Sequence, residues 1–81
     1  MSEQKSEQRK NYVYRAMNPE QADDETRRLL RMVTKGGKDT RDAIQGLMVL
    51  ANIGFVSAIH AMSDLINDGY GRIVDEVMNI L

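Results

Sequence analysis

The chain of 81 residues has no cysteine, no tryptophan and a single histidine. Without cysteine it cannot form a disulfide, a thiolate nucleophile or a cysteine-ligated metal site. The histidine, His60, has only Asp64 as a potential co-ligand within one helical turn, and a metal site needs several ligands. The N-terminus also lacks the apolar core of a secretory signal. We therefore expect a cytoplasmic protein without enzymatic activity, cofactor or metal.

The chain has a single proline, and this proline and several of the six glycines mark the ends of the predicted helices. The only proline lies in the 18–21 segment, NPEQ, which has the pattern of a capping box and predicts the start of a helix. The glycine pair at 36–37 predicts its end. The Asn-Asp-Gly sequence at 67–69 predicts a turn, and the 72–81 segment then has the pattern of a short amphipathic helix.

Charge is absent from the central stretch, since residues 43–63 contain no Asp, Glu, Lys or Arg. Its apolar residues recur at spacings of 4, 3, 4, 3, 4 and 3, which predicts one long helix over 43–66 with a heptad seam. Further apolar stripes leave this helix apolar nearly all round, and so short a chain cannot cover it alone. We expect an intertwined homo-oligomer, in the simplest case a dimer. Its interface would be the seam, which consists of Ile44, Met48, Ala51, Phe55, Ala58, Met62 and Leu65.

Lipid is the alternative cover for the central stretch, because about 20 apolar residues suffice to cross a bilayer. Polar residues interrupt this run at intervals, and polar groups in hydrocarbon are costly unless they are paired. The interrupting residues are Gln45, Asn52, Ser57, His60 and Ser63. We therefore favour cover by protein over a membrane span.

The N-terminal part is the least regular. Residues 1–8 are polar and cannot bury enough apolar surface to order themselves, which predicts a disordered tail. Residues 9–17, RKNYVYRAM, alternate as a short strand would, although an irregular arm or an extra helical turn fits equally well. The expected fold is mainly α in a single domain over 9–81. It would consist of an arm plus first helix (9–42), a central helix (43–66) and a C-terminal helix (72–81).

The two halves of the chain differ in charge. Ten basic and eight acidic side chains give residues 1–42 a net charge of +2, whereas one basic and four acidic side chains give residues 43–81 a net charge of −3. Arg27, Arg31 and Lys35 recur every four residues on one helix face, with Lys38 and Arg41 beyond the turn. Such a patch can neutralise phosphates. Alternatively, it is a solvated face whose cations pair with nearby aspartates.

The pattern of 9–52 resembles that of the ribbon-helix-helix repressors of the Arc type. RKNYVYRAM corresponds to the family's strand, NPEQADDETRRLLRMVTK to its first helix, and GGKDTRDAIQGLM to its turn and second-helix start. In that family two strands pair across a dimer and enter the DNA major groove. The resemblance implies that Tyr12 and Tyr14 face the core. It implies that the residues facing DNA are Arg9, Asn11, Val13 and Arg15, and that Lys38, Asp39 and Thr40 lie near a phosphate.

Two hypotheses for function follow. The first is a small dimeric regulator of transcription that reads duplex DNA through the 9–17 strand or arm. In that case the DNA-binding residues are Arg9, Asn11, Val13, Arg15, Arg27, Arg31, Lys35, Lys38 and Thr40. The second is a non-enzymatic helical module, such as an inhibitor, adaptor or assembly subunit, whose arm holds a protein partner. A paired strand over 9–17 favours DNA, whereas a helical or disordered arm favours the protein-interaction module.

Overall fold

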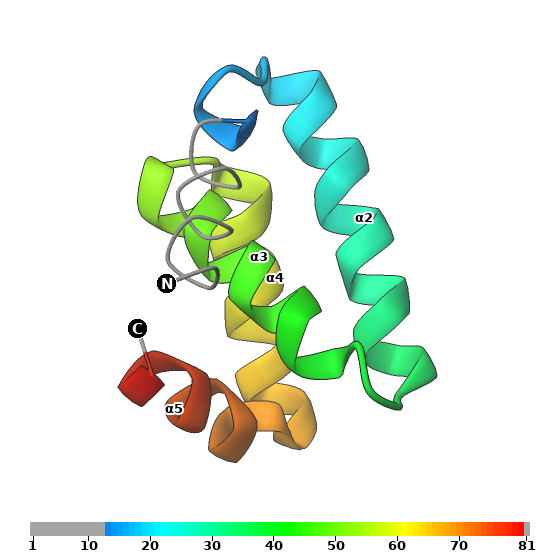
Figure 1. The fold of residues 1–81 in the computed structure, drawn as a ribbon. Helices are drawn as coiled ribbons and strands as arrows, with labels where there is room; N and C mark the ends of the chain where they lie inside the picture. Colours follow the sequence, from blue (N-terminus) through cyan, green and yellow to red (C-terminus); the bar gives the residue numbers. More distant parts are fainter. Residues whose placement is uncertain (1–12, 81) are drawn as a thin grey trace, which may run out of the picture.

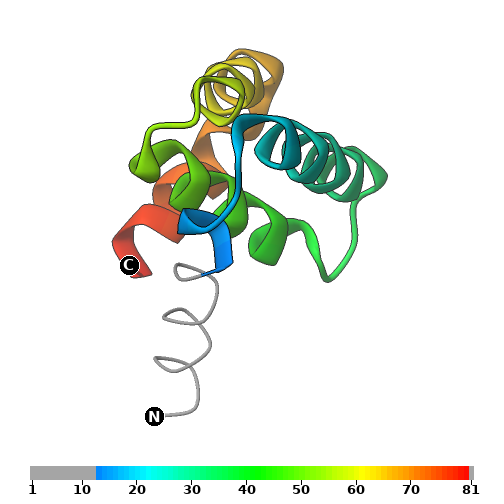
Figure 2. The same ribbon diagram turned by 90° about the horizontal axis from the view of Figure 1, so that it is seen from above.

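The computed structural model describes residues 13–80, and over these the chain is built from helices joined by short turns (Figures 1 and 2). The mainly α fold class is thus confirmed, and no strand occurs within residues 13–80. Helix α3 contacts α2, α4 and α5, so it is the element around which the others pack. The helices are α2 (Pro19–Lys35), α3 (Thr40–Ile53), α4 (Val56–Leu65) and α5 (Gly71–Ile80), with a wide helical turn, η1 (Ile66–Tyr70), before α5.

Helix α2 begins and ends where the sequence predicts. The Asn18 side chain accepts a hydrogen bond from the backbone N–H of Gln21 at 2.8 Å, and Gln21 Oε1 accepts one from the Asn18 N–H at 3.0 Å. This reciprocal pair satisfies amide groups that the first turn of a helix leaves without partners. At the other end Gly36 has φ 77, a left-handed conformation that a side chain disfavours.

The predicted single helix over 43–66 is wrong, because the chain breaks at Gly54. Gly54 has φ 115, and its N–H lies 3.1 Å from the Ala51 oxygen and 3.3 Å from the Leu50 oxygen. The Phe55 N–H donates to the same Leu50 oxygen at 3.2 Å, which closes the end of α3 as a Schellman-type turn. Helices α3 and α4 then pack on each other, so the apolar faces that would surround one long helix cover one another.

This break also changes the role of the heptad seam. Ile44, Ala58 and Leu65 are at most 2% exposed inside a single chain, and the other seam residues are partly buried. The cover that the sequence assigns to a second copy is supplied here by α2, α4 and α5. These three residues therefore belong to the core of one chain, and in this arrangement they are not available as an interface between copies. The largest fully buried side chains are Ile44, Leu47, Leu50, Leu65 and Val33.

The predictions for the segments on either side of this core differ in how they compare with the structure. Residues 13–15 form a helical turn, which is one of the alternatives to a strand that the sequence left open, with Tyr14 buried and Val13 exposed. The rest of that predicted strand, residues 9–12 with Tyr12, lies outside the described residues, as does the predicted tail over 1–8. The predicted C-terminal helix is confirmed as α5, and the predicted turn before it contains Gly69 with φ 100.

Gly46 lies buried in α3 beside Leu29 of α2 and the hydroxyl group of Tyr14. A β-carbon at this position would lie 3.0 Å from Leu29 Cδ1 and 3.1 Å from Tyr14 Oη. Those distances are tighter than ordinary van der Waals contacts. The missing side chain therefore allows the 13–15 turn and α2 to pack against α3 at this point.

Candidate interaction surfaces

The basic residues of α2 occupy its outer face. Arg27, Arg31 and Lys35 are exposed, while the opposite face of α2 buries Ala22, Thr26, Leu29 and Val33. Among residues 13–80, no carboxylate forms an ion pair with any of these three cations. The face is therefore a row of solvated positive charges, which we call the α2 basic stripe.

The residues after α2 do not all extend this stripe. Lys38 is exposed in the turn, whereas the Thr40 side chain is only 8% exposed at the start of α3. Arg41 forms an ion pair with Glu76 of α5, with 2.6 Å between Nη2 and Oε2. The predicted patch beyond the turn is thus reduced to Lys38 as an unpaired cation among the described residues.

The predicted base-reading residues are only partly described. Val13 is 57% exposed and Arg15 is exposed, as the strand interpretation requires, but both belong to the helical turn at 13–15. That turn lies near the start of α2, whereas Lys35 lies at its other end (Figure 1). Helix α2 has 17 residues and so spans roughly 25 Å. Arg9 and Asn11 lie outside the described residues.

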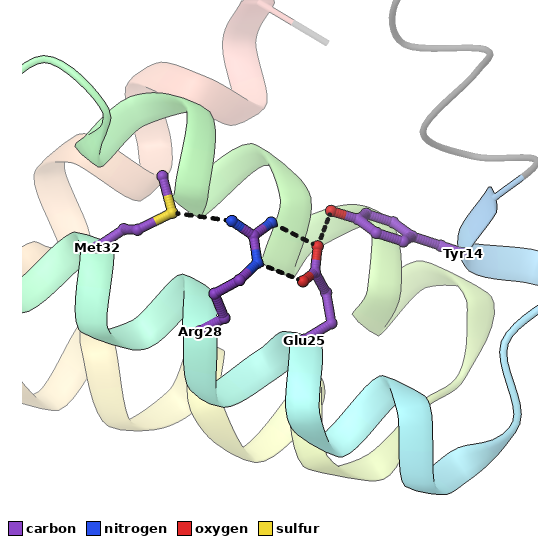
Figure 3. A network of polar contacts seen from close by, with 4 residues as sticks. All are labelled: Tyr14, Glu25, Arg28 and Met32. Carbon is purple, nitrogen blue, oxygen red and sulfur yellow. Dashed lines mark hydrogen bonds and ion pairs between the residues drawn. The ribbon is translucent and has the colours of Figure 1, made fainter.

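A polar network fixes the 13–15 turn against α2 (Figure 3). The Tyr14 hydroxyl group donates a hydrogen bond to Glu25 Oε2 at 2.8 Å. Arg28 holds the same carboxylate with two donors, Nε to Oε1 at 2.6 Å and Nη2 to Oε2 at 2.8 Å, and its Nη1 lies 3.6 Å from Met32 Sδ. The two-point pair is the geometry in which guanidinium and carboxylate groups bind most strongly.

The network shifts two pKa values. Burial raises the pKa of Tyr14 well above its ordinary value near 10, and the hydrogen bond to Glu25 raises it further. The hydrogen bond with Glu25 also raises the pKa of Arg28. Both shifts stabilise the forms present at neutral pH, a neutral phenol and a guanidinium cation. The network is thus a structural clamp, and sequence reasoning missed it because Tyr14 and Glu25 are eleven residues apart without a shared pattern.

A groove between α3, α4 and α5 is the second candidate surface. It has a volume of about 490 Å³, and three of its six lining residues are methionines. Methionine side chains are flexible and polarizable, so they adapt to apolar ligands of varied shape. The lining residues are Met48, Val49, Ala51, Asn52, Met62 and Met78, which we call the methionine groove.

Sequence reasoning found this groove only in part. Met48, Ala51 and Met62 belong to the predicted seam, and the structure brings them together although α3 and α4 are separate helices. Met78 lies in the predicted C-terminal helix over 72–81, and nothing local in the sequence indicates that it lies beside Met48 and Met62. Apolar residues of α4 and η1 are also exposed outside the groove, namely Val56 at 63%, Ile59 at 47% and Ile66 at 53%.

None of the helices over residues 13–80 is long and apolar enough to cross a membrane. Within the same residues, no three side chains of the His, Cys, Asp and Glu types lie together as a group that could hold a metal ion.

Comparison of the chain with protein-family models, with curated proteins and with solved structures found no match. The described residues offer two candidate binding surfaces, the α2 basic stripe and the methionine groove.

Proposed function

We propose that this protein is a non-enzymatic, cytoplasmic helical interaction module that binds an apolar helix of a partner protein in the methionine groove. The observation that carries the proposal is the groove itself, in which Met48, Met62 and Met78 from three different helices line one hollow. Amphipathic helices bind to other proteins by laying their apolar face into a groove of this kind. The groove accepts varied apolar shapes because its methionines can repack.

Charge indicates what kind of helix fits. The second half of the chain, which supplies all of the groove, carries one basic and four acidic side chains. Of these acids, Glu76 is already paired with Arg41, whereas Asp64, Asp68 and Asp75 form no ion pair within residues 13–80. A partner helix with basic residues flanking its apolar face would therefore be attracted to this side of the molecule.

The helical turn at 13–15 also supports this proposal over the DNA-reading strand. A strand that reads DNA needs its outward residues in extended conformation, and Val13 and Arg15 are in a helical turn here. The clamp between Tyr14 and Glu25 holds the turn in place, at 2.8 Å. Tyr14, one of the two tyrosines that the resemblance assigns to the core, is buried, and its hydroxyl group contacts Glu25 in α2 of its own chain.

The test uses the methionine methyl groups as probes. The chain labelled with ¹³C at these methyls is titrated with a synthetic 18-residue helical peptide of leucine and lysine, and with a scrambled peptide of the same composition. Signals of Met48, Met62 and Met78 should shift with the helical peptide, whereas those of Met17 and Met32 should not. Equal shifts of all methyls, or equal binding of the scrambled peptide, would count against the groove.

A matched pair of substitutions distinguishes binding in the groove from nonspecific binding to exposed apolar residues. Met62→Glu places a charge in the groove, whereas Val13→Glu places one on an exposed apolar residue outside it. We expect Met62→Glu to weaken binding of the peptide at least tenfold and Val13→Glu to leave it unchanged. Equal affinities for the two variants would reject the proposed site. Circular dichroism of each variant would check that it keeps its helical content.

A second function, binding of duplex DNA through the α2 basic stripe, is favoured by one specific observation. Arg27, Arg31 and Lys35 are exposed on one face without carboxylate partners among residues 13–80. In a dimeric regulator this stripe would contact phosphates and so position the protein, while bases would be read by the strand or arm over 9–17. We expect each cation that contacts a phosphate to contribute about one unit to the slope of log affinity against log salt concentration.

The DNA hypothesis is tested with a salt series. Binding to random-sequence duplex is measured for the unmodified chain, for Arg31→Gln and for the control Arg72→Gln, which changes a basic residue of α5 away from the stripe. Arg31→Gln should lower the salt slope by about one, and Arg72→Gln should leave it unchanged. Absence of duplex binding near 100 mM salt would reject this function.

A further inference from the structure

Only two residues, Gly54 and Phe55, separate α3 from α4. Gly54 has φ 115 and ψ 10, and Phe55 has φ −70 and ψ 116. Phe55 already has a helical φ, so three dihedral angles alone distinguish this connection from continuous helix. Apart from Gly54 itself and the backbone next to it in the chain, no heavy atom of the described residues lies within 4 Å of the place where a β-carbon of Gly54 would be. The connection is thus a short hinge that the surrounding side chains do not hold at Gly54.

The sequence on both sides of this hinge keeps one helical register. The apolar spacing of 4, 3, 4, 3, 4 and 3 runs from Ile44 to Leu65 without a shift at Gly54. With the hinge helical, α3 and α4 would join into one helix of about 26 residues, roughly 39 Å long. The same side chains would then form a continuous seam along that helix.

In the bent hinge, the backbone amide groups at the start of α4 are poorly provided with hydrogen-bond acceptors. Phe55, the residue before α4, provides no side-chain cap to the first amides of the helix. Phenylalanine has no oxygen with which to cap them, unlike the residues preferred at this position. Within residues 13–80, the hydroxyl group of Ser57 in the first turn is buried and has no hydrogen-bond partner. Joining α3 and α4 would give those amides the carbonyl partners that an uninterrupted helix supplies.

We infer that this chain exchanges α4 and α5 between two copies by straightening at Gly54. In the exchanged dimer each copy contributes one long helix, and its α4 and α5 pack on α2 and α3 of the other copy. The buried contacts of Ala58, Leu65 and Val74 are remade between copies, so the exchange loses little of the core. Short hinges favour such exchange because straightening relieves the bend. This inference goes beyond the proposed function and does not depend on it.

The ion pair between Arg41 and Glu76 reports on the exchange. These residues lie on opposite sides of the hinge, and their side chains are 2.6 Å apart. In the bent monomer the pair lies within one chain, whereas in the exchanged dimer it joins the two chains. A dimer formed by docking of two bent monomers would keep the pair within each chain.

The first experiment compares Gly54→Ala with Gly37→Ala. Both glycines have positive φ and open space where a β-carbon would lie, so both substitutions strain the bent backbone alike. Only straightening at Gly54 relieves that strain within a dimer. We expect Gly54→Ala to raise the dimerisation constant on the order of a hundredfold, about tenfold for each of two hinges, and Gly37→Ala to leave it near that of the unmodified chain. Sedimentation equilibrium measures the constants after incubation near the melting temperature.

The second experiment locates the ion pair. Arg41→Lys allows a carbodiimide to join residue 41 to Glu76 through an amide bond. The reaction is run on a dimer formed from equal amounts of ¹⁵N-labelled and unlabelled chains, and the crosslinked peptides are read by mass spectrometry. In an exchanged dimer about half of the crosslinks should join a labelled to an unlabelled peptide.

Each of the two experiments has a result that would overturn the exchange of α4 and α5. Crosslinks that join only peptides of equal label would overturn it, as would equal dimerisation constants for the two glycine variants. If Gly54→Ala does not fold, the unmodified chain and a variant with two glycines inserted after Ile53 are compared at about 1 mM. The longer hinge should lower the dimer fraction, and an unmodified chain that stays monomeric at that concentration would overturn the exchange.

Discussion

Substitution of Gly46 by alanine should have two opposing effects on stability, a gain in helix propensity and a cost from overpacking. In the interior of a helix, alanine is favoured over glycine by about 1 kcal/mol. At Gly46, however, the added methyl would lie 3.0 Å from Leu29 Cδ1 and 3.1 Å from Tyr14 Oη. Leu29 is only 3% exposed, and the Tyr14 hydroxyl group is tied to Glu25 at 2.8 Å, so neither neighbour moves freely.

Overpacking of a dense core costs roughly 1–3 kcal/mol. After subtraction of the gain in helix propensity, we expect Gly46→Ala to lower the free energy of unfolding by about 1 kcal/mol. Gly71 of α5 provides the matched control, because a β-carbon there would meet, among the described residues, only Ile66 Cγ2 at an ordinary 3.7 Å. Gly71→Ala should therefore be neutral or stabilising by up to about 1 kcal/mol. The two substitutions should therefore have different effects on the free energy of unfolding, although both place alanine in a helix.

Urea denaturation followed by circular dichroism measures both changes, and a double-mutant cycle identifies their cause. In a Tyr14→Phe background the 3.1 Å contact is absent, so the destabilisation by Gly46→Ala should shrink by at least about 0.5 kcal/mol. A Gly46→Ala variant that is as stable as Gly71→Ala would refute the tight packing of α2 and the 13–15 turn on α3. An unchanged cost in the Tyr14→Phe background would show that Tyr14 takes no part in it.

Two further predictions concern the capping box and the clamp. Asn18→Ala should cost about 1 kcal/mol of stability because it removes the acceptor of the Gln21 amide, whereas Asp39→Ala, whose side chain makes no cap hydrogen bond, should cost markedly less in the same thermal-melt assay. The pKa of Tyr14 is raised in the folded chain, so its stabilisation is fully present below about pH 10 and is lost as the pH rises from there through the folded-state value. The stability difference between the unmodified chain and Tyr14→Phe should therefore be constant near pH 8 and fall by up to about 1.4 kcal/mol per pH unit above pH 10, and a flat difference would contradict the clamp.

The helix ends that local chemistry decides could be predicted from the sequence. Asn18 and Gln21 satisfy the amides of α2 by themselves, so their pattern is informative without knowledge of the rest of the fold. The same holds for Gly36 and for Gly69, whose left-handed conformations end α2 and redirect the chain into α5. Each of these signals acts within a few residues of the position that it determines.

The break at Gly54 could not be predicted in this way. A single glycine inside an apolar helix costs only about 1 kcal/mol, which is too little to decide between a continuous and a broken helix. Packing of α4 on α3 and α2 decides it, because a broken helix can bury Ala58 and Leu65 within one chain. The methionine groove exists only as a result of this folding back, so the sequence could indicate its α3 and α4 residues but not their meeting with Met78.

The central position of α3 has a consequence for the order in which the chain opens. Because α3 contacts α2, α4 and α5, any one outer helix can detach while α3 keeps two neighbours. Amide hydrogen exchange should consequently be slowest at fully buried Leu47 and Leu50 in α3 and faster in α5, which is one of the outer helices. Exchange in α3 should report global unfolding, whereas exchange in α5 should report a local opening that breaks the Arg41–Glu76 ion pair and removes Met78 from the groove.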